Sequence, residues 1–343
     1  MTEQQFLQQL EQAMESLPAE ERNDILQDIR EYFANGRADG KSENEIAAEL
    51  GSPEAIAKEL IDSFDFSQST IPVEKIDISK DKFDKVDIQT DNSLVQISPS
   101  NDGQMHVDVE NKTYRQHLAV DILDRTLVIT LKEEPKKWGF FTITGSFKSP
   151  TLIVQLPPKL YEKIQILSDH GTITGARLES TELLVETDNG SIDLNRINAE
   201  IFAVKSDNGA IKLSEVQTKS LRAETDNGQL SLKDVRAEKL HAASDNGAIT
   251  LKDIEGDVQA QTDNGRIHLL AADLERTISL ETDNGSILLE TKRQPENATI
   301  NADVDWGSVS VFGSRKRRTV YGTGQHPIDL QSDNGSITVK LVG

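Results

Sequence analysis

The chain of 343 residues contains no cysteine, which excludes disulfide bridges and thiolate chemistry. Phe, Trp and Tyr make up only 5% of it, so any core must be built mainly from Ile, Leu and Val. No run of 18 apolar residues occurs, and residues 1–30 carry neither a signal-peptide core nor a lipid-attachment cysteine. From these absences we expect a soluble, cytoplasmic protein, with export to the cell surface by a non-classical route as the alternative.

Common catalytic motifs are missing as well. We find no HExxH, P-loop or GxSxG motif, and Gly322-Thr323-Gly324 lacks the third glycine and the strand–helix context of a dinucleotide site. The net charge is −21, and residues 1–70 alone carry 16 acidic and 5 basic side chains. Because nucleic-acid affinity comes mostly from cations that neutralise phosphates, we expect no nucleic-acid partner.

The feature that organises the sequence is a repeated Asp-Asn-Gly triplet. From Asp169 to Asp245 its copies are 19 residues apart, and a fixed period of this size indicates a repeat architecture. Apolar residues alternate with polar ones on both sides of each triplet, which predicts two short strands per repeat. The copies begin at Asp188, Asp207, Asp226, Asp245, Asp263, Asp283 and Asp333, with degenerate versions at Asp91, Asp169 and Asp305.

Each triplet is interpreted as a structural turn. Gly would supply a positive φ, Asn tolerates the left-handed region, and Asp would bond to the backbone of its own turn. A row of aspartates could also bind Ca²⁺, but the spacing does not fit a nonapeptide calcium β-roll, so we expect no metal and no cofactor. The most regular turns are Asp188-Asn189-Gly190, Asp207-Asn208-Gly209, Asp226-Asn227-Gly228 and Asp245-Asn246-Gly247.

Two folds can place these turns. Asn-Gly between alternating strands is typical of β-hairpins, but a meander of about twenty strands exceeds the roughly ten that an open twisted sheet tolerates. The sequence therefore favours a parallel β-solenoid (β-helix) with coils of about 19 residues, with stacked β-hairpins as the alternative. In the solenoid, Ile192, Ile211 and Leu230 should stack in one inward row.

The first residues predict helices. Thr2 with Gln5 and Ser42 with Glu45 form capping boxes, and Asn35-Gly36 is expected to end the second helix. The last two helices have the rhythm of a DNA-reading helix-turn-helix, but their acidic surface would repel phosphate. We therefore predict an α+β multidomain protein with a helical module at 1–64, a linker at 65–72, a first coil with degenerate coils or a capping sheet at 73–168, and the repeat solenoid at 169–343.

Several motifs carry a family resemblance. Leu17-Pro18, Tyr32-Phe33, Gly40-Lys41-Ser42-Glu43 and Leu50-Gly51-Ser52-Pro53 resemble the HAAS domain, a short helical module of bacterial envelope-signalling proteins. The Asp-Asn-Gly turns, preceded by Leu156-Pro157-Pro158-Lys159-Leu160-Tyr161, resemble the bacterial "putative adhesin" β-strand-repeat family, and together the two parts resemble the LiaX-like family of Gram-positive bacteria. The resemblance implies a role in the envelope-stress response and no catalytic residues.

Two stretches interrupt the repeat pattern. One, with Lys136, Lys137, Trp138, Phe140 and Phe141, joins aromatic residues to a cation pair, and the other is the basic run Arg315, Lys316, Arg317 and Arg318. Both are candidate binding residues for a partner or an anionic membrane surface, because aromatic and cationic side chains suit such a surface together. The alternative for the aromatic stretch is an end cap of the solenoid.

The resulting functional hypothesis is a non-catalytic envelope-stress or signalling protein. Its helical module would bind a protein partner of that pathway, and its solenoid would offer an extended surface, with peripheral contact to an anionic membrane as a second expectation. One alternative is a structural or adhesive β-helix that binds glycan or self-assembles. Another is a β-helix polysaccharide enzyme, which would need two carboxylates converging in a cleft.

Overall fold

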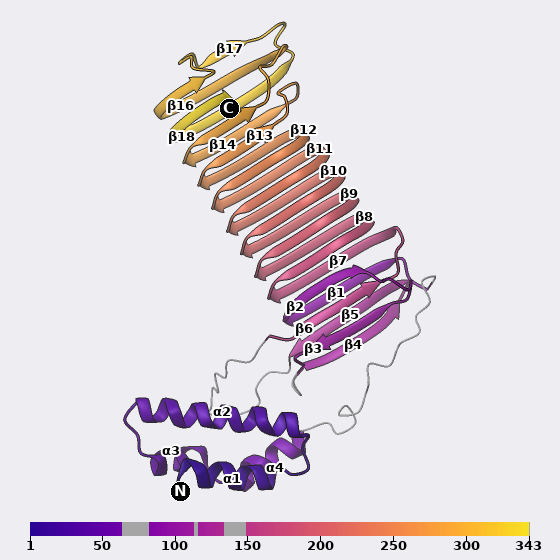
Figure 1. The fold of residues 1–343 in the computed structure, drawn as a ribbon, viewed down its shortest axis with the longest axis vertical. Helices are drawn as coiled ribbons and strands as arrows, with labels where there is room; N and C mark the ends of the chain where they lie inside the picture. Colours follow the sequence, from indigo (N-terminus) through magenta and orange to yellow (C-terminus); the bar gives the residue numbers. More distant parts are fainter. Residues whose placement is uncertain (64–81, 113–115, 134–148, 343) are drawn as a thin grey trace. The chain divides into compact units, whose positions relative to one another are not determined.

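The computed structural model describes residues 1–63, 82–112, 116–133 and 149–342, in which the helices belong to one compact unit and the strands to another (Figure 1). The predicted linker at 65–72 lies outside these residues. The helices are α1 (Glu3–Ala13), α2 (Ala19–Ala38), α3 (Glu43–Leu50) and α4 (Pro53–Ser63). In the described residues, no helix is long and apolar enough to cross a membrane.

Local signals explain where the helices begin. Thr2 and Ser42 each accept a hydrogen bond from the backbone of the third helical residue, which completes the two predicted capping boxes. The prediction that Asn35-Gly36 ends the second helix is wrong, because α2 continues to Ala38. Gly36 therefore lies inside the helix. A Cβ at this position would come within 2.7 Å of the Ile46 side chain, so the absence of a side chain makes room for α3.

The described residues of the β unit form eighteen strands. The first seven are β1 (Lys85–Asn92), β2 (Leu94–Pro99), β3 (His106–Glu110), β4 (Gln116–Leu123), β5 (Thr126–Glu133), β6 (Thr151–Leu156) and β7 (Tyr161–His170). The long central strands are β8 (Ile173–Asn189), β9 (Ile192–Asn208), β10 (Ile211–Asn227), β11 (Leu230–Asn246) and β12 (Ile249–Asn264). The last six are β13 (Ile267–Ala271), β14 (Ile278–Asn284), β15 (Ile287–Thr291), β16 (Ala298–Val311), β17 (Arg318–Val320) and β18 (His326–Leu341).

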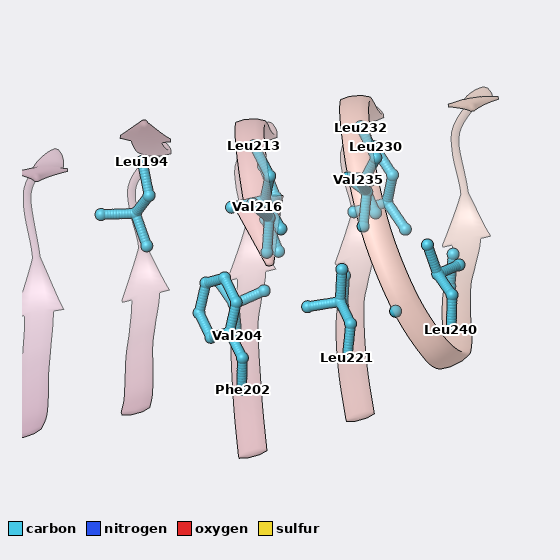
Figure 2. Close-up of a cluster of buried hydrophobic side chains, with 14 of the residues drawn as sticks. Leu194, Phe202, Val204, Leu213, Val216, Leu221, Leu230, Leu232, Val235 and Leu240 are labelled. Atoms are coloured by element: carbon cyan, nitrogen blue, oxygen red, sulfur yellow. The ribbon is translucent and has the colours of Figure 1, made fainter. Parts of the chain in front are cut away.

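Stacked coils of a parallel β-solenoid account for these strands. Ile192 pairs with Ile211 and Ile211 with Leu230, always in parallel, so the predicted inward row and the solenoid are confirmed and the stacked hairpins are wrong. Neighbouring coils of a parallel ladder lie about 4.8 Å apart. The same inward positions recur in coil after coil as rows of Leu, Val and Phe side chains, which form one continuous core (Figure 2).

Each of the long coils β8 to β12 has three straight segments, one more than the two strands that the sequence predicts. In β9 the buried positions alternate over Ile192–Leu194, again over Ile197–Ala199 and again over 202–206, with a shift in parity at each corner. Arg196, whose φ is +55°, forms the first corner. The same corner position in the other long coils is occupied by Arg177, Glu215, Asp234 and Asp253, which also have positive φ angles. This corner could not be predicted from the sequence, because charged residues adopt a left-handed backbone conformation there that usually favours Gly or Asn.

The glycine of each triplet serves close packing and does not supply a positive φ, contrary to our prediction. The φ angles of Gly190, Gly209, Gly228 and Gly247 lie outside the left-handed region, and a Cβ on any of them would fall within 2.0 Å of the carbonyl oxygen of the triplet glycine in the preceding coil. The glycines therefore form a column in which coils approach closely, because no side chain separates them.

The asparagines of the triplets form a ladder along the outside of the solenoid. From Asn208 onward, each amide nitrogen donates to the amide oxygen of the asparagine in the coil beneath, as in Asn227 to Asn208 and Asn246 to Asn227, both at 3.1 Å. The ladder continues through Asn264 and Asn284 to Asn334. The residue before each Asp is buried, and from Ser206 onward its hydroxyl donates to the carbonyl of the triplet glycine in the coil beneath, as Thr225 does to Gly209 at 3.0 Å. The buried hydroxyl of Thr187 has no partner among the described residues.

The aspartates of the triplets do not have the role that we predicted. Within the described residues, none of the seven Asp-Asn-Gly aspartates bonds to the backbone of its own turn; Asp207, for example, pairs with Lys205 at 2.7 Å. The side-chain bonds at the corner are instead made by Asn and by the preceding Ser or Thr, whose partners lie in neighbouring coils.

Because the asparagine bonds to other coils and the neighbouring aspartate does not, substitutions at the two positions are expected to lower the free energy of unfolding by different amounts. Asn227→Ala removes a donor and an acceptor of the ladder and is expected to lower the free energy of unfolding by about 1 kcal/mol. Asp226→Ala, at an exposed position, should change it by less than about 0.5 kcal/mol. Urea unfolding followed by circular dichroism measures both, and equal losses would contradict the assignment of the ladder to asparagine.

At both ends of the solenoid the chain inserts a coil one layer inside the stack. The first coil, β1 and β2, pairs with β5 and β6 on one side and with β7 and β8 on the other. Likewise β18 pairs with β14 and β15 on one side and with β16 on the other (Figure 1). The outermost described coil at the C-terminal end is therefore β16, which precedes β18 in the sequence.

Candidate functional site

The C-terminal end of the solenoid is partly covered by the segment that follows β16. The backbones of Val311 and Ser314 bond to each other, and the carbonyl of Arg317 accepts the Ala302 N–H at 2.7 Å, so residues 312–317 cross from one side of the coil to another. The rings of Phe312 and Tyr321 meet edge-on with centroids 6.2 Å apart and pack against the core. Partial burial raises the pKa of the Tyr321 hydroxyl, so that group stays neutral.

The basic run predicted as a binding site lies on this segment. Arg317 has a structural role, because its guanidinium contacts Asp303 and donates to the carbonyl oxygen of Val304 at 2.8 Å. Arg315, Lys316 and Arg318 are exposed, and no carboxylate of the described residues pairs with them. We call these three residues the end cations. Three of the four predicted cations are therefore available to a ligand.

Sequence reasoning missed the most exposed large apolar side chain of this end. Trp306 is 79% exposed and occupies, in the outermost coil, the position that Asn334 holds in the next coil. A tryptophan in place of the asparagine ends the ladder. The signal was present in the degenerate triplet Asp305-Trp306-Gly307, where an aromatic residue stands at a position that should face solvent.

The other predicted site residues stand differently. Lys136, Lys137, Trp138, Phe140 and Phe141 lie outside the described residues. The predicted turn residues lie in one corner of successive coils. In the described part of the chain, no group of three or more His, Asp or Glu is arranged to hold a metal ion, although the triplet aspartates repeat along the corner.

The opposite end of the β unit has a cleft of about 310 Å³ between Pro99, Pro157, Pro158, Arg177 and Glu179. Lys159 also lines this cleft. Its amine donates to the Phe83 carbonyl and lies 4.7 Å from the centroid of the Phe83 ring and 5.0 Å from that of the Tyr161 ring. Burial raises the pKa of the Tyr161 hydroxyl, which donates to Pro157 O at 2.8 Å. These polar groups stabilise the local structure and are not arranged as an acid–base pair.

The helical unit has a closed core and a charged surface. Phe6 and Phe33 meet edge-on at 5.6 Å inside it, and among its described large apolar side chains only Met1 is exposed. Lys41 donates to Glu49 at 2.8 Å, and this bond raises the pKa of the lysine. The surface is therefore suited to polar contacts.

Comparison with known proteins gives two family matches. The model of the family described as Toastrack DUF4097 matches residues 83–340, and that of HAAS matches residues 5–59. No curated protein matches the chain. Among solved structures, a "putative adhesin" from Bacteroides fragilis is similar at 15% identity, covering 76% of this chain and 94% of that one, with a TM-score of 0.39. A "putative cell adhesion protein" from Clostridium sporogenes is similar at 13% identity over 77% and 96%, with a TM-score of 0.21.

Proposed function

Because the chain belongs to the Toastrack DUF4097 family and carries a HAAS domain, we propose that it is a non-catalytic interaction protein of the bacterial envelope-stress response. In this proposal the HAAS domain binds a protein partner of the pathway, and the solenoid presents an extended surface to a second ligand.

One observation carries the proposal. The molecule has two separately closed cores, one of packed helices and one of stacked coils, and its described polar groups repeat along the coils rather than converge in a cleft. A hydrolase of polysaccharides needs two carboxylates facing each other across a substrate site. A row of equivalent groups on a rigid rod is suited to binding, because it presents the same chemistry at regular intervals.

The test is a stress-reporter assay in the native host. A strain lacking the chain is complemented with the full-length protein or with the double variant Glu54→Lys, Glu59→Lys, which reverses two exposed charges on α4. We expect the variant to lose the reporter response by roughly tenfold, since rim charges steer association. The matched control, Glu179→Lys with Glu238→Lys on exposed positions of the solenoid, should respond like the wild type.

Two outcomes would contradict the proposal. An unchanged response in the helical variant, with the protein folded and present at normal levels, would show that the HAAS surface is not used. Binding of the purified protein to cell-wall glycan, without any effect on the reporter, would instead support the adhesive alternative.

A further inference from the structure

The outermost coil, β16, has an open edge. On one side it pairs with β18 over its whole length, from Ala298 to Val311. On the other side β17 covers only residues 299–301, and single contacts are made at Ala302, at Val311 and at the carbonyl of Val304, which accepts from the Arg317 guanidinium. In the described part of the chain, residues 304–310 therefore lack a strand on the outer side. We call this segment the open edge.

The direction of the free backbone groups follows from the coils beneath. Gly190 and Ile192 donate their N–H groups to the following coil, at 3.0 and 2.9 Å. Through the register, Gly307 and Val309 hold the same places in β16, because they pair with Gly335 and Ile337. Among the residues that the structure describes, no coil follows β16. Their N–H groups therefore point away from the stack. Unpaired edge groups of this kind are a template for an added strand.

The open edge is marked by positive charge. The end cations have no carboxylate partner within the described residues, although the whole chain carries a net charge of −21. Two acidic residues lie on the same coil: Asp303, which Arg317 neutralises, and the exposed Asp305. On β16 and the segment 312–318, cations thus outnumber acids, and the exposed Trp306 adds an apolar side chain to the same coil.

We propose that the open edge binds an extended acidic segment of a partner protein, which adds to the end of the solenoid as a further strand. Backbone bonds to residues 304–310 would provide affinity, as in other cases of strand addition, and the end cations would select for acidic side chains. A second copy of the chain fits less well, because a two-fold pairing of this edge with itself would bring the end cations of both copies together. The inference names the ligand of the solenoid surface and so rests on the proposed function.

The test measures fluorescence anisotropy with the full-length protein and labelled peptides. The probe alternates Glu and Val, one control peptide alternates Lys and Val, and a second control keeps the Glu-Val sequence but carries an N-methyl group on every backbone nitrogen. We expect saturable binding of the first peptide only, because the lysine peptide has the wrong charge and the methylated one cannot complete a ladder.

Variants locate the site. Arg315→Glu with Lys316→Glu should weaken binding of the Glu-Val peptide about tenfold or more, and Trp306→Ala should also weaken it. The matched control, Lys239→Glu with Lys252→Glu, makes the same charge change at exposed positions of β11 and β12 and should leave binding unchanged. Thermal unfolding of each variant shows that a loss of binding is not a loss of fold.

The proposal is overturned if no peptide binds, or if the lysine or methylated peptide binds as well as the probe. It is also overturned if vesicles of phosphatidylcholine with phosphatidylglycerol bind the end cations while the peptides do not, since the surface would then be a membrane contact. The stress-reporter assay depends on α4, so a failure of strand addition, together with loss of the reporter response in the α4 variant, leaves the proposed function standing.

Discussion

Replacing Gly228 by alanine is expected to lower the free energy of unfolding of the β unit by more than about 3 kcal/mol. The new Cβ would lie 2.0 Å from the carbonyl oxygen of Gly209 and 2.9 Å from the Thr225 hydroxyl oxygen, in the middle of the stack. Because the two nearest atoms belong to the backbone of Gly209, a side-chain rotation cannot relieve the clash, so the coils must separate locally and lose ladder bonds. Urea unfolding followed by circular dichroism in the strand region measures the loss.

A glycine without neighbours provides the control. Gly103 has a φ of +72° and nothing within 4 Å of an added Cβ, so Gly103→Ala should cost only the 1–2 kcal/mol or so of a left-handed residue. If the two variants unfold at the same urea concentration, close approach of the coils is not what requires glycine in the triplet.

Deleting residues 326–343 is expected to have a still larger effect. The deletion removes Ile328, Leu330, Ile337 and Val339, which are buried, and at about 1.5–3 kcal/mol each they contribute roughly 6–12 kcal/mol. It also removes the one strand that pairs with β16 along its whole length. Amide hydrogen exchange should therefore show residues 298–311 unprotected, while β9 to β11 keep their protection because their own neighbours remain.

Deletion of residues 342–343 alone is the control for this experiment. Val342 makes a single described backbone bond, to the carbonyl of Thr291, so exchange in β16 should stay slow. Protection of 298–311 in the long deletion would mean that β16 has a partner other than β18.

The repeat and its stacking could be predicted from the sequence, because equivalent apolar residues recur at a fixed spacing and pair with each other in adjacent coils, as Ile192, Ile211 and Leu230 do. The sequence did not predict the order of coils at the ends, because β16 and β18 carry the same alternation and either could be outermost. Nor did it predict the corner at Arg196, where contacts with the adjoining coils outweigh the local preference of the residue.

The candidate site was predicted in part for a similar reason. A sequence shows which residues are charged, so the basic run that contains Arg315, Lys316 and Arg318 could be predicted. It does not show which charged residues pair with each other, so the contacts of Arg317 with Asp303 and Val304 required the structure. The open edge could not be predicted, because it depends on which coil has no neighbour.

The asparagine ladder also has a consequence for the chemical lifetime of the protein. Asn-Gly is the dipeptide in which the following backbone nitrogen most readily attacks the side-chain amide. The attack releases ammonia and forms a cyclic imide, which water then opens to an acid, and such asparagines are heat-labile. In the folded solenoid that amide is held in the ladder, and the nitrogens of Gly190, Gly247, Gly265 and Gly285 each donate to an asparagine carbonyl of the next coil. Folding thus slows the loss of these side-chain amides. A chain that stays unfolded accumulates new carboxylates at positions that must stack on one another, and with each one it becomes less able to rebuild the stack.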